Sequence, residues 1–262
     1  MKVFRIAILS IVALFIVGIT VWIQQGEDRD ALYQVSVLRG LMQGDYDGKI
    51  ALHTIRSHGD FGLGTFDRLD GEAIELDGVF YQVKADGKVK RVDSNVKSPF
   101  AMATFFNSDM EFHLDQDSDY VSLQQLIDSR LPTKNIPYAI KIEGKFSYVK
   151  VRSVPEQNKP YPFLSEVIKN QSVFEFKDIE GTLIGFRMPD CMQSVNVPGY
   201  HMHFLSRDKT KGGHVLGLSL NNAVIKIDDI NRFIMELPKS QDFYNLDFSV
   251  SADDGLATEK SK

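Results

Sequence analysis

The chain has 262 residues, 43% of them hydrophobic and 25% charged, and its formal net charge is −5. This composition predicts a globular protein with a sizeable core, as one large domain or two small ones, and the negative charge without a long basic run argues against a nucleic-acid partner. The single cysteine, Cys191, excludes an intramolecular disulfide and a cysteine-based zinc site.

The N-terminal residues have the pattern of a targeting signal. Lys2 and Arg5 precede an apolar run from Ile6 to Ile23, and a cationic start before an apolar stretch is typical of export. The run is just long enough to span a membrane. We therefore expect residues 1–26 to be an export signal or membrane anchor, with the rest of the chain periplasmic or extracellular. Both a cleaved signal and an uncleaved tether at residues 6–23 stay open.

The first half of the chain is expected to be a sheet-rich domain over residues 27–154. Two Asp-Gly pairs, Asp77-Gly78 and Asp86-Gly87, predict two-residue hairpin turns. Side chains alternate along a strand, so the strand before Asp77 carries Glu72 on its apolar face and Glu75 on the other, solvated face. An inward carboxylate is costly unless it is paired or used. Glu72 is therefore a candidate functional residue, although at a strand end it could also reach water.

The remaining elements are predicted to be short strands and a few helices. A helix is expected over residues 122–130, and strand pairs are expected to turn at Glu143-Gly144 and at Glu180-Gly181. Three prolines between Pro155 and Pro162 indicate a linker, which makes residues 163–262 the second domain. In that domain we predict a turn at Asn221-Asn222, a helix over residues 229–237 and a last strand over residues 243–250. Many short strands with few helices indicate an α+β chain.

Three of the six histidines lie in one window of the second half. His201 and His203 share one face of a predicted strand. A polar turn then leads to a second strand that opens with His214, and a hairpin would bring this residue beside the first pair. Neutral imidazole is a ligand for zinc, iron, copper and nickel, and three protein ligands suit a catalytic site with an open position. A His-x-His pair by itself also occurs by chance. The third histidine, at the start of the partner strand, favours a metal site over a chance pair.

Four segments of the sequence together resemble the alpha-acetolactate decarboxylase family. The segments are Gly59–Phe66, Leu69–Glu72, Leu76–Gly78 and Asn196–Leu205. The resemblance runs from about Ala31 to the C-terminus. It implies a two-domain α/β fold, with mixed sheets in both halves and a zinc ion (Zn²⁺) between them held by His201, His203 and His214. It also suggests a homodimer.

The resemblance further implies the catalytic residues and the reaction. The glutamate of the Leu-Asp-Gly-Glu motif is Glu72, an arginine on the strand before the linker is Arg152, and a glutamate near the C-terminus corresponds to Glu259. The implied reaction is decarboxylation of 2-acetolactate to acetoin, with the metal as electron sink for the enediolate. Arg152 would hold the substrate carboxylate, and the two glutamates would donate and move protons. Which glutamate does which stays open.

Two other classes of protein fit part of the sequence. Cupin-like metal dioxygenases share the Gly-x-His-x-His pattern, but a glutamate normally follows it, and the only acid between Phe204 and Gly213 is Asp208. A non-enzymatic, exported metal-binding module would explain the N-terminus and the histidines, but not an inward Glu72. The choice of zinc over other divalent metals depends on the resemblance alone.

Overall fold

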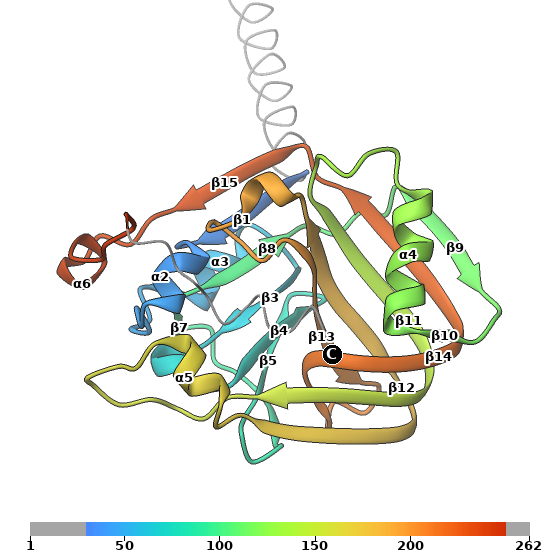
Figure 1. Ribbon diagram of the computed structural model, residues 1–262, viewed down its shortest axis with the longest axis horizontal. Helices are drawn as coiled ribbons and strands as arrows, with labels where there is room; N and C mark the ends of the chain where they lie inside the picture. Colours follow the sequence, from blue (N-terminus) through green and yellow to red (C-terminus); the bar gives the residue numbers. More distant parts are fainter. Residues whose placement is uncertain (1–29, 250–262) are drawn as a thin grey trace, which may run out of the picture.

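The computed structural model describes residues 30–249, and these form two packed β-sheets with a few short helices (Figure 1). The first sheet has seven strands in the order β15-β1-β8-β3-β4-β5-β6. Its strands are β1 Ala31–Val35, β3 Phe61–Thr65, β4 Glu72–Leu76, β5 Val79–Val83, β6 Val89–Arg91, β8 Ala101–Thr104 and β15 Arg232–Glu236. The β1–β15 pair is parallel and the other neighbours are antiparallel, so the sheet is mixed.

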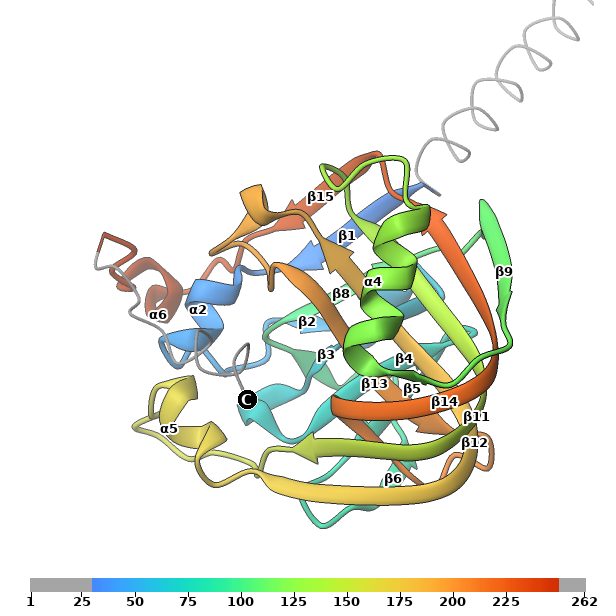
Figure 2. The ribbon, with the colours of Figure 1, turned by 45° about the vertical axis from the view of Figure 1, so that its right-hand side comes forward.

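The second sheet has six strands, four of which close into a ring. Its strands are β9 Met110–Leu114, β10 Ser118–Asp119, β11 Tyr138–Ser153, β12 Ser172–Met188, β13 Gly199–Ser206 and β14 Gly212–Asp229. Strand β11 pairs with β12 and β14, and β13 also pairs with both, which closes the ring. The interior of the ring is apolar and includes Phe146 and Phe204, whose rings meet edge to face at 5.3 Å. Helix α4 (Tyr120–Arg130) packs Leu123 and Ile127 against this core (Figure 2).

A second apolar core lies between the two sheets. Leu63 and Ile74 from the first sheet meet Ile184 and Leu205 from the second in one cluster of buried side chains. Burial of each such side chain stabilises the fold by roughly 1.5–3 kcal/mol. The strand that carries Glu72 is therefore fixed against the strands that carry the histidines.

Short elements surround the two sheets. They are α2 Leu38–Met42, α3 Leu52–Arg56, α5 Leu164–Ile168, α6 Gln241–Tyr244, the strand pair β2 Ile50–Ala51 and β7 Lys97–Ser98, and 3-10 turns at Asp67–Leu69 and Asp190–Met192. Within residues 30–249, no helix is long and apolar enough to cross a membrane. The predicted export segment, residues 1–26, lies outside the described residues.

Long bent strands replace three of the predicted turns, so those predictions were wrong. Glu143-Gly144, Glu180-Gly181 and Asn221-Asn222 lie inside β11, β12 and β14. Gly144 pairs with Gly181 on one side and with Ala223 on the other, so the three sites lie side by side across the sheet. A Cβ atom on Gly144 would lie 2.5 Å from the carbonyl oxygen of Asn222. Glycine in a strand can mark such a close approach of backbones as well as a turn.

The C-terminal segment also differs from the prediction. The expected helix over residues 229–237 is wrong, because β15 is a strand that pairs in parallel with β1. The expected strand over residues 243–250 is wrong as well: Ser240 caps α6, and its side chain accepts a hydrogen bond from the Phe243 amide. Pairing with a strand about 200 residues away decides the conformation of β15, and local periodicity cannot show such a partner.

The two sheets do not follow the predicted domain boundaries. Strand β15 lies after the proline-rich linker, yet it belongs to the first sheet, whereas β9, β10 and β11 lie before the linker and belong to the second. The ranges 27–154 and 163–262 therefore do not correspond to one sheet each. Both predicted hairpins are present, joining β4 to β5 and β5 to β6. The two-residue turn is confirmed at Asp77-Gly78 but not at Asp86-Gly87, where Val83 pairs with Val89 and the Lys84 amide donates to the carbonyl oxygen of Lys88, so the loop has three residues.

The predicted exposure of Glu75 was wrong. Glu75 does lie on the opposite face of β4 from Glu72, but α3 and the loop after it cover this face, and Glu75 is 0% exposed. Neither carboxylate oxygen has a hydrogen-bond partner among the described residues. Burial, with the nearby charge of Asp60, raises the pKa of Glu75 to about 9, against the opposing effect of Arg56. The side chain is thus buried as a neutral acid at ordinary pH.

We expect Glu75→Met to stabilise the protein by about 2 kcal/mol, because it removes two unpaired buried oxygens and keeps the length of the side chain. The folded-state pKa of about 9 lies above the ordinary value. The penalty that Glu75 imposes on folding is therefore smallest below its unfolded pKa, where the group is neutral in both states, and it grows as the pH rises toward 9. The advantage of the methionine variant should therefore be larger at pH 9 than at pH 5. Urea unfolding at both pH values measures it.

Glu175→Met is the matched control for this substitution, since Glu175 is an exposed residue of β12. A surface charge of this kind contributes little to stability, and the control should shift the free energy of unfolding only slightly. If Glu75→Met were no more stable than the wild-type protein at either pH, Glu75 would have a partner that compensates for its burial.

Candidate metal centre

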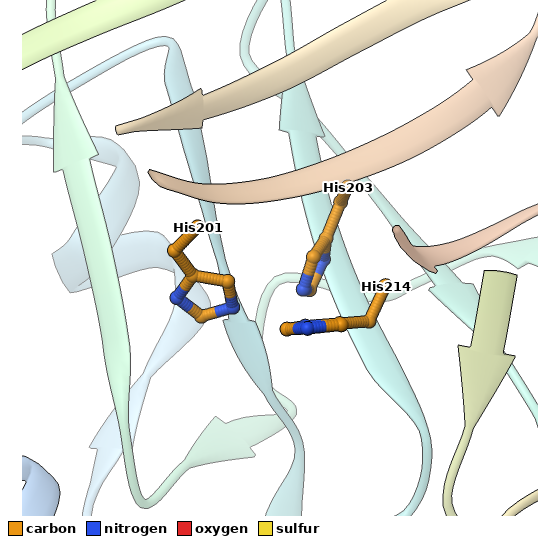
Figure 3. A group of neighbouring side chains, drawn as sticks. All are labelled: His201, His203 and His214. Carbon is orange, nitrogen blue, oxygen red and sulfur yellow. The ribbon is translucent and has the colours of Figure 1, made fainter. Parts of the chain in front are cut away.

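Three histidine side chains converge at one point between the sheets (Figure 3). His201 and His203 lie on β13, and the register of the β13–β14 hairpin places His214 directly opposite His203, as the sequence predicted. Their potential ligand atoms all lie within 4.8 Å of one another. The ring centroids are 4.9 to 5.3 Å apart.

The environment keeps all three imidazoles neutral. Burial, with the charge of Arg152 nearby, lowers the pKa of His201 to about 3. Burial also holds the pKa values of His203 and His214 well below the usual range, and Arg152 and the neighbouring histidines act in the same direction. Neutral imidazoles keep the lone pairs that a metal ion needs.

The hydrogen bonds indicate which nitrogen atoms are free. Nδ1 of His203 lies 2.9 Å from the main-chain oxygen of Ala73 on β4, and because a carbonyl can only accept, this nitrogen donates. Its Nε2 atom and Nδ1 of His201 are buried and have no hydrogen-bond partner in the described part of the chain. Buried polar atoms without partners are rare. These residues therefore fit a metal ion with three histidine ligands.

Glu72 approaches the histidines from the opposite sheet. It lies on the inner face of β4, is 7% exposed, and its Oε2 atom is 3.6 Å from Nε2 of His203. Burial raises the pKa of Glu72 to about 7, and the charge of Arg152 opposes this rise. The structure thus brings together a carboxyl group and histidines that lie far apart in the sequence, at residue 72 and residues 201–214.

Arg152 lies beside the same cluster on β11, directly opposite His214 of β14. It is 8% exposed. Its Nη1 atom donates to Oε1 of Gln171 at 3.2 Å, and its Nε atom is buried with no hydrogen-bond partner among the described residues. No acidic side chain of residues 30–249 forms an ion pair with it. Burying a guanidinium without an acidic partner costs free energy of folding. Such a group is suited to binding an anion from outside the chain.

The sequence did not predict three neighbours of this site. Gln171 contacts Arg152, the carbonyl of Ala73 orients His203, and Thr65 lies opposite Glu72 in the β3–β4 pair. Thr65 belongs to one of the segments that carry the family resemblance, but its position beside Glu72 follows only from the strand register. Glu259, the predicted tail glutamate, lies outside the described residues.

The fold and the site define a class of protein: a mostly β protein whose neutral histidines can hold a metal ion beside a buried carboxyl group. The protein-family model described as alpha-acetolactate decarboxylase matches residues 32–250 of the chain. The chain is 45% identical over 227 residues to the alpha-acetolactate decarboxylase of Methanosarcina mazei, covering 87% of this chain and 79% of the relative. It is 44% identical to that of Methylococcus capsulatus, covering 88% and 89%.

A solved structure is similar over the same region. The crystal structure of alpha-acetolactate decarboxylase from Bacillus subtilis strain 168 superposes with a TM-score of 0.84 at 37% identity, covering 87% of this chain and 97% of that one. The chain belongs to the alpha-acetolactate decarboxylase family, which confirms the resemblance found in the sequence.

Proposed function

We propose that the chain converts 2-acetolactate to acetoin and carbon dioxide at the site formed by the three histidines, Glu72 and Arg152. Membership of the family makes the chain a carboxy-lyase, an acetolactate decarboxylase. The observation that carries the site assignment is the cluster of three neutral histidines, two of which have buried nitrogens with no hydrogen-bond partner in the described part of the chain. The family match favours this function over a cupin-like dioxygenase and over a non-enzymatic metal-binding module.

His201, His203 and His214 would hold the metal ion, and we propose zinc. Three neutral ligands leave the charge of a divalent ion uncompensated, so the bound ion supplies Lewis-acid stabilisation of the negative charge that develops as carbon dioxide leaves. The carbonyl of Ala73 keeps the proton of His203 on Nδ1, which leaves Nε2 as its ligand atom. Such outer contacts fix the orientation of a metal-bound imidazole.

Arg152 would bind the carboxylate of the substrate. Its guanidinium is buried beside His214 and has no acidic partner among residues 30–249. The planar guanidinium group can bind a carboxylate through two parallel hydrogen bonds, which also fixes the orientation of the bound molecule.

Glu72 would move a proton at the reacting carbon or at the hydroxyl group of the substrate. Its carboxyl group points toward His203 from the opposite sheet, and burial holds its pKa near neutrality, where a group can both take up and release a proton. We propose Glu259 of the C-terminal tail as the second proton-transferring group, on the family resemblance alone.

We expect chelation to abolish acetoin formation and zinc to restore it. A strong chelator removes the metal ion, and the substrate then loses the charge stabilisation that its decarboxylation requires. Acetoin and carbon dioxide are measured after incubating the purified protein with 2-acetolactate, first before chelation, then after it, and finally after addition of zinc, manganese or cobalt. Failure of every added metal to restore activity to a still-folded protein would refute the metal role, and restoration by another metal alone would refute zinc.

We also propose that the protein is exported and that it forms a homodimer. The basic start and apolar run of residues 1–23 support export, and finding the protein in the cytoplasmic fraction of cells would contradict it.

The proposed homodimer is supported by an exposed apolar edge. In the described structure β15 is an edge strand of the first sheet, and Met235 in this strand and Leu237 just after it are 39% and 46% exposed. A monomeric mass in solution by light scattering would rule the dimer out.

A further inference from the structure

Among residues 30–249, one neutral side chain, that of Gln171, is hydrogen-bonded to the guanidinium of Arg152. Of the five N–H donors of a guanidinium, the structure gives Arg152 one hydrogen bond, from Nη1 to Oε1 of Gln171 at 3.2 Å. Its Nε atom is buried and has no hydrogen-bond partner within residues 30–249. No other described side chain is hydrogen-bonded to this guanidinium, so Gln171 is the contact that selects its orientation.

The fold holds Gln171 firmly in place. The residue lies in the turn between α5 and β12, where its own amide donates to the carbonyl oxygen of Ile168 at 3.1 Å. Strand β12 begins at the next residue and pairs at once with β11, Ser172 with Ser153 and Val173 with Arg152. The backbone on both sides of the Gln171–Arg152 contact is therefore fixed by secondary structure, although the two residues are 19 positions apart.

The chemistry of the contact matters as much as its position. A glutamate at residue 171 would have nearly the same shape, but it would form a charge-assisted hydrogen bond with Arg152, which is roughly twice as strong as a neutral one. It would also neutralise the guanidinium charge that is proposed to bind the substrate carboxylate. The glutamine amide orients the guanidinium and leaves its charge unpaired.

We propose that Gln171 is a positioning residue for substrate binding: it orients Arg152 through a neutral hydrogen bond and so keeps the guanidinium available for a carboxylate. This inference rests on the proposed function, and it adds the reason why a buried arginine can remain unpaired within the described chain. Gln171 does not touch the metal site in the structure and acts through Arg152 alone.

The test compares Gln171→Glu, Gln171→Leu and the control Asn170→Asp in steady-state kinetics with 2-acetolactate. We expect Gln171→Glu to raise KM on the order of tenfold or more, since an internal carboxylate then competes with that of the substrate. The Gln171→Leu variant should raise KM by a smaller factor, because Arg152 keeps its charge and loses only its orientation. In both variants kcat should change much less than KM, and the zinc content should be that of the wild-type protein.

Asn170 is an exposed neighbour of Gln171, so Asn170→Asp adds the same charge one residue away, and its KM should remain near the wild-type value. A folded Gln171→Glu variant with a KM within twofold of wild-type would overturn the positioning role. So would parallel losses of zinc, melting temperature and kcat, because a purely structural residue behaves that way. If Gln171→Glu does not fold, Gln171→Leu serves as the test. A raised KM with a nearly unchanged kcat in this variant would support the positioning role, and an unchanged KM would overturn it. A wild-type protein that forms no acetoin in the same assay would instead defeat the proposed function, and this inference with it.

Discussion

The His203→Ala variant is expected to lose both its bound metal and its acetoin-forming activity. His203 is the most enclosed of the three histidines: it is 0% exposed, its Nδ1 atom is committed to the carbonyl of Ala73, and its Nε2 atom has no partner within the described chain. Loss of a supporting contact to a metal ligand typically costs 10- to 100-fold in metal affinity, so loss of the ligand itself should cost more than about 100-fold.

Two measurements separate this effect from unfolding. Zinc content by elemental analysis should fall to background, while the circular dichroism spectrum stays that of a folded β protein. His113→Ala is the control, because His113 is an exposed residue of β9 and its loss should change neither zinc content nor activity. Full zinc content and normal acetoin formation in His203→Ala would show that the ligand set has been misassigned.

Glu72→Gln should fold and bind zinc but turn over far more slowly. Glutamine has the shape of glutamic acid, yet it cannot take up or release a proton, and general acid–base catalysis typically contributes 10²- to 10⁴-fold to a rate. We therefore expect kcat to fall by about that factor, with little change in zinc content. Single-turnover measurements of acetoin formation would register the loss directly at the chemical step.

The same strand provides the control. Glu75→Gln makes the identical change three residues further along β4, on the face that points away from the histidines. Glu75 is buried as a neutral acid, and the amide should leave turnover at the wild-type level. Near-normal turnover of Glu72→Gln would remove Glu72 from the mechanism, and equal losses in both variants would mean that a glutamine in β4 disturbs the site through the sheet.

The histidine cluster could be predicted from the sequence because its geometry is local. Two histidines at a spacing of two share a strand face, and the short polar turn to His214 is a hairpin in the structure. The position of Glu72 on an inward face followed from the same alternation. The resemblance to a family then supplied Arg152, whose burial and lack of an acidic partner in the described chain no sequence pattern could show.

The errors arose where distant parts of the chain determine local structure. Glu75 was expected in solvent, because alternation separates two faces but does not show that α3 covers the second one. The sequence predicts a helix where β15 lies, because local periodicity does not show that this segment pairs with β1, at the other end of the described chain. No sequence pattern marks Gln171, since its proposed role depends on a contact with a residue on a neighbouring strand.

The pairing of β1 with β15 has a consequence for the order in which the molecule can assemble. Until residues 232–236 have been synthesised, β1 has only β8 as a neighbour, and β11 similarly waits for β12 and β14 on its two sides. Contacts between such distant segments form slowly. The proposed metal site, which needs β4, β11, β13 and β14 together, should thus be among the last features to appear during biosynthesis, and a ribosome-bound chain that stops short of β14 should bind no metal there.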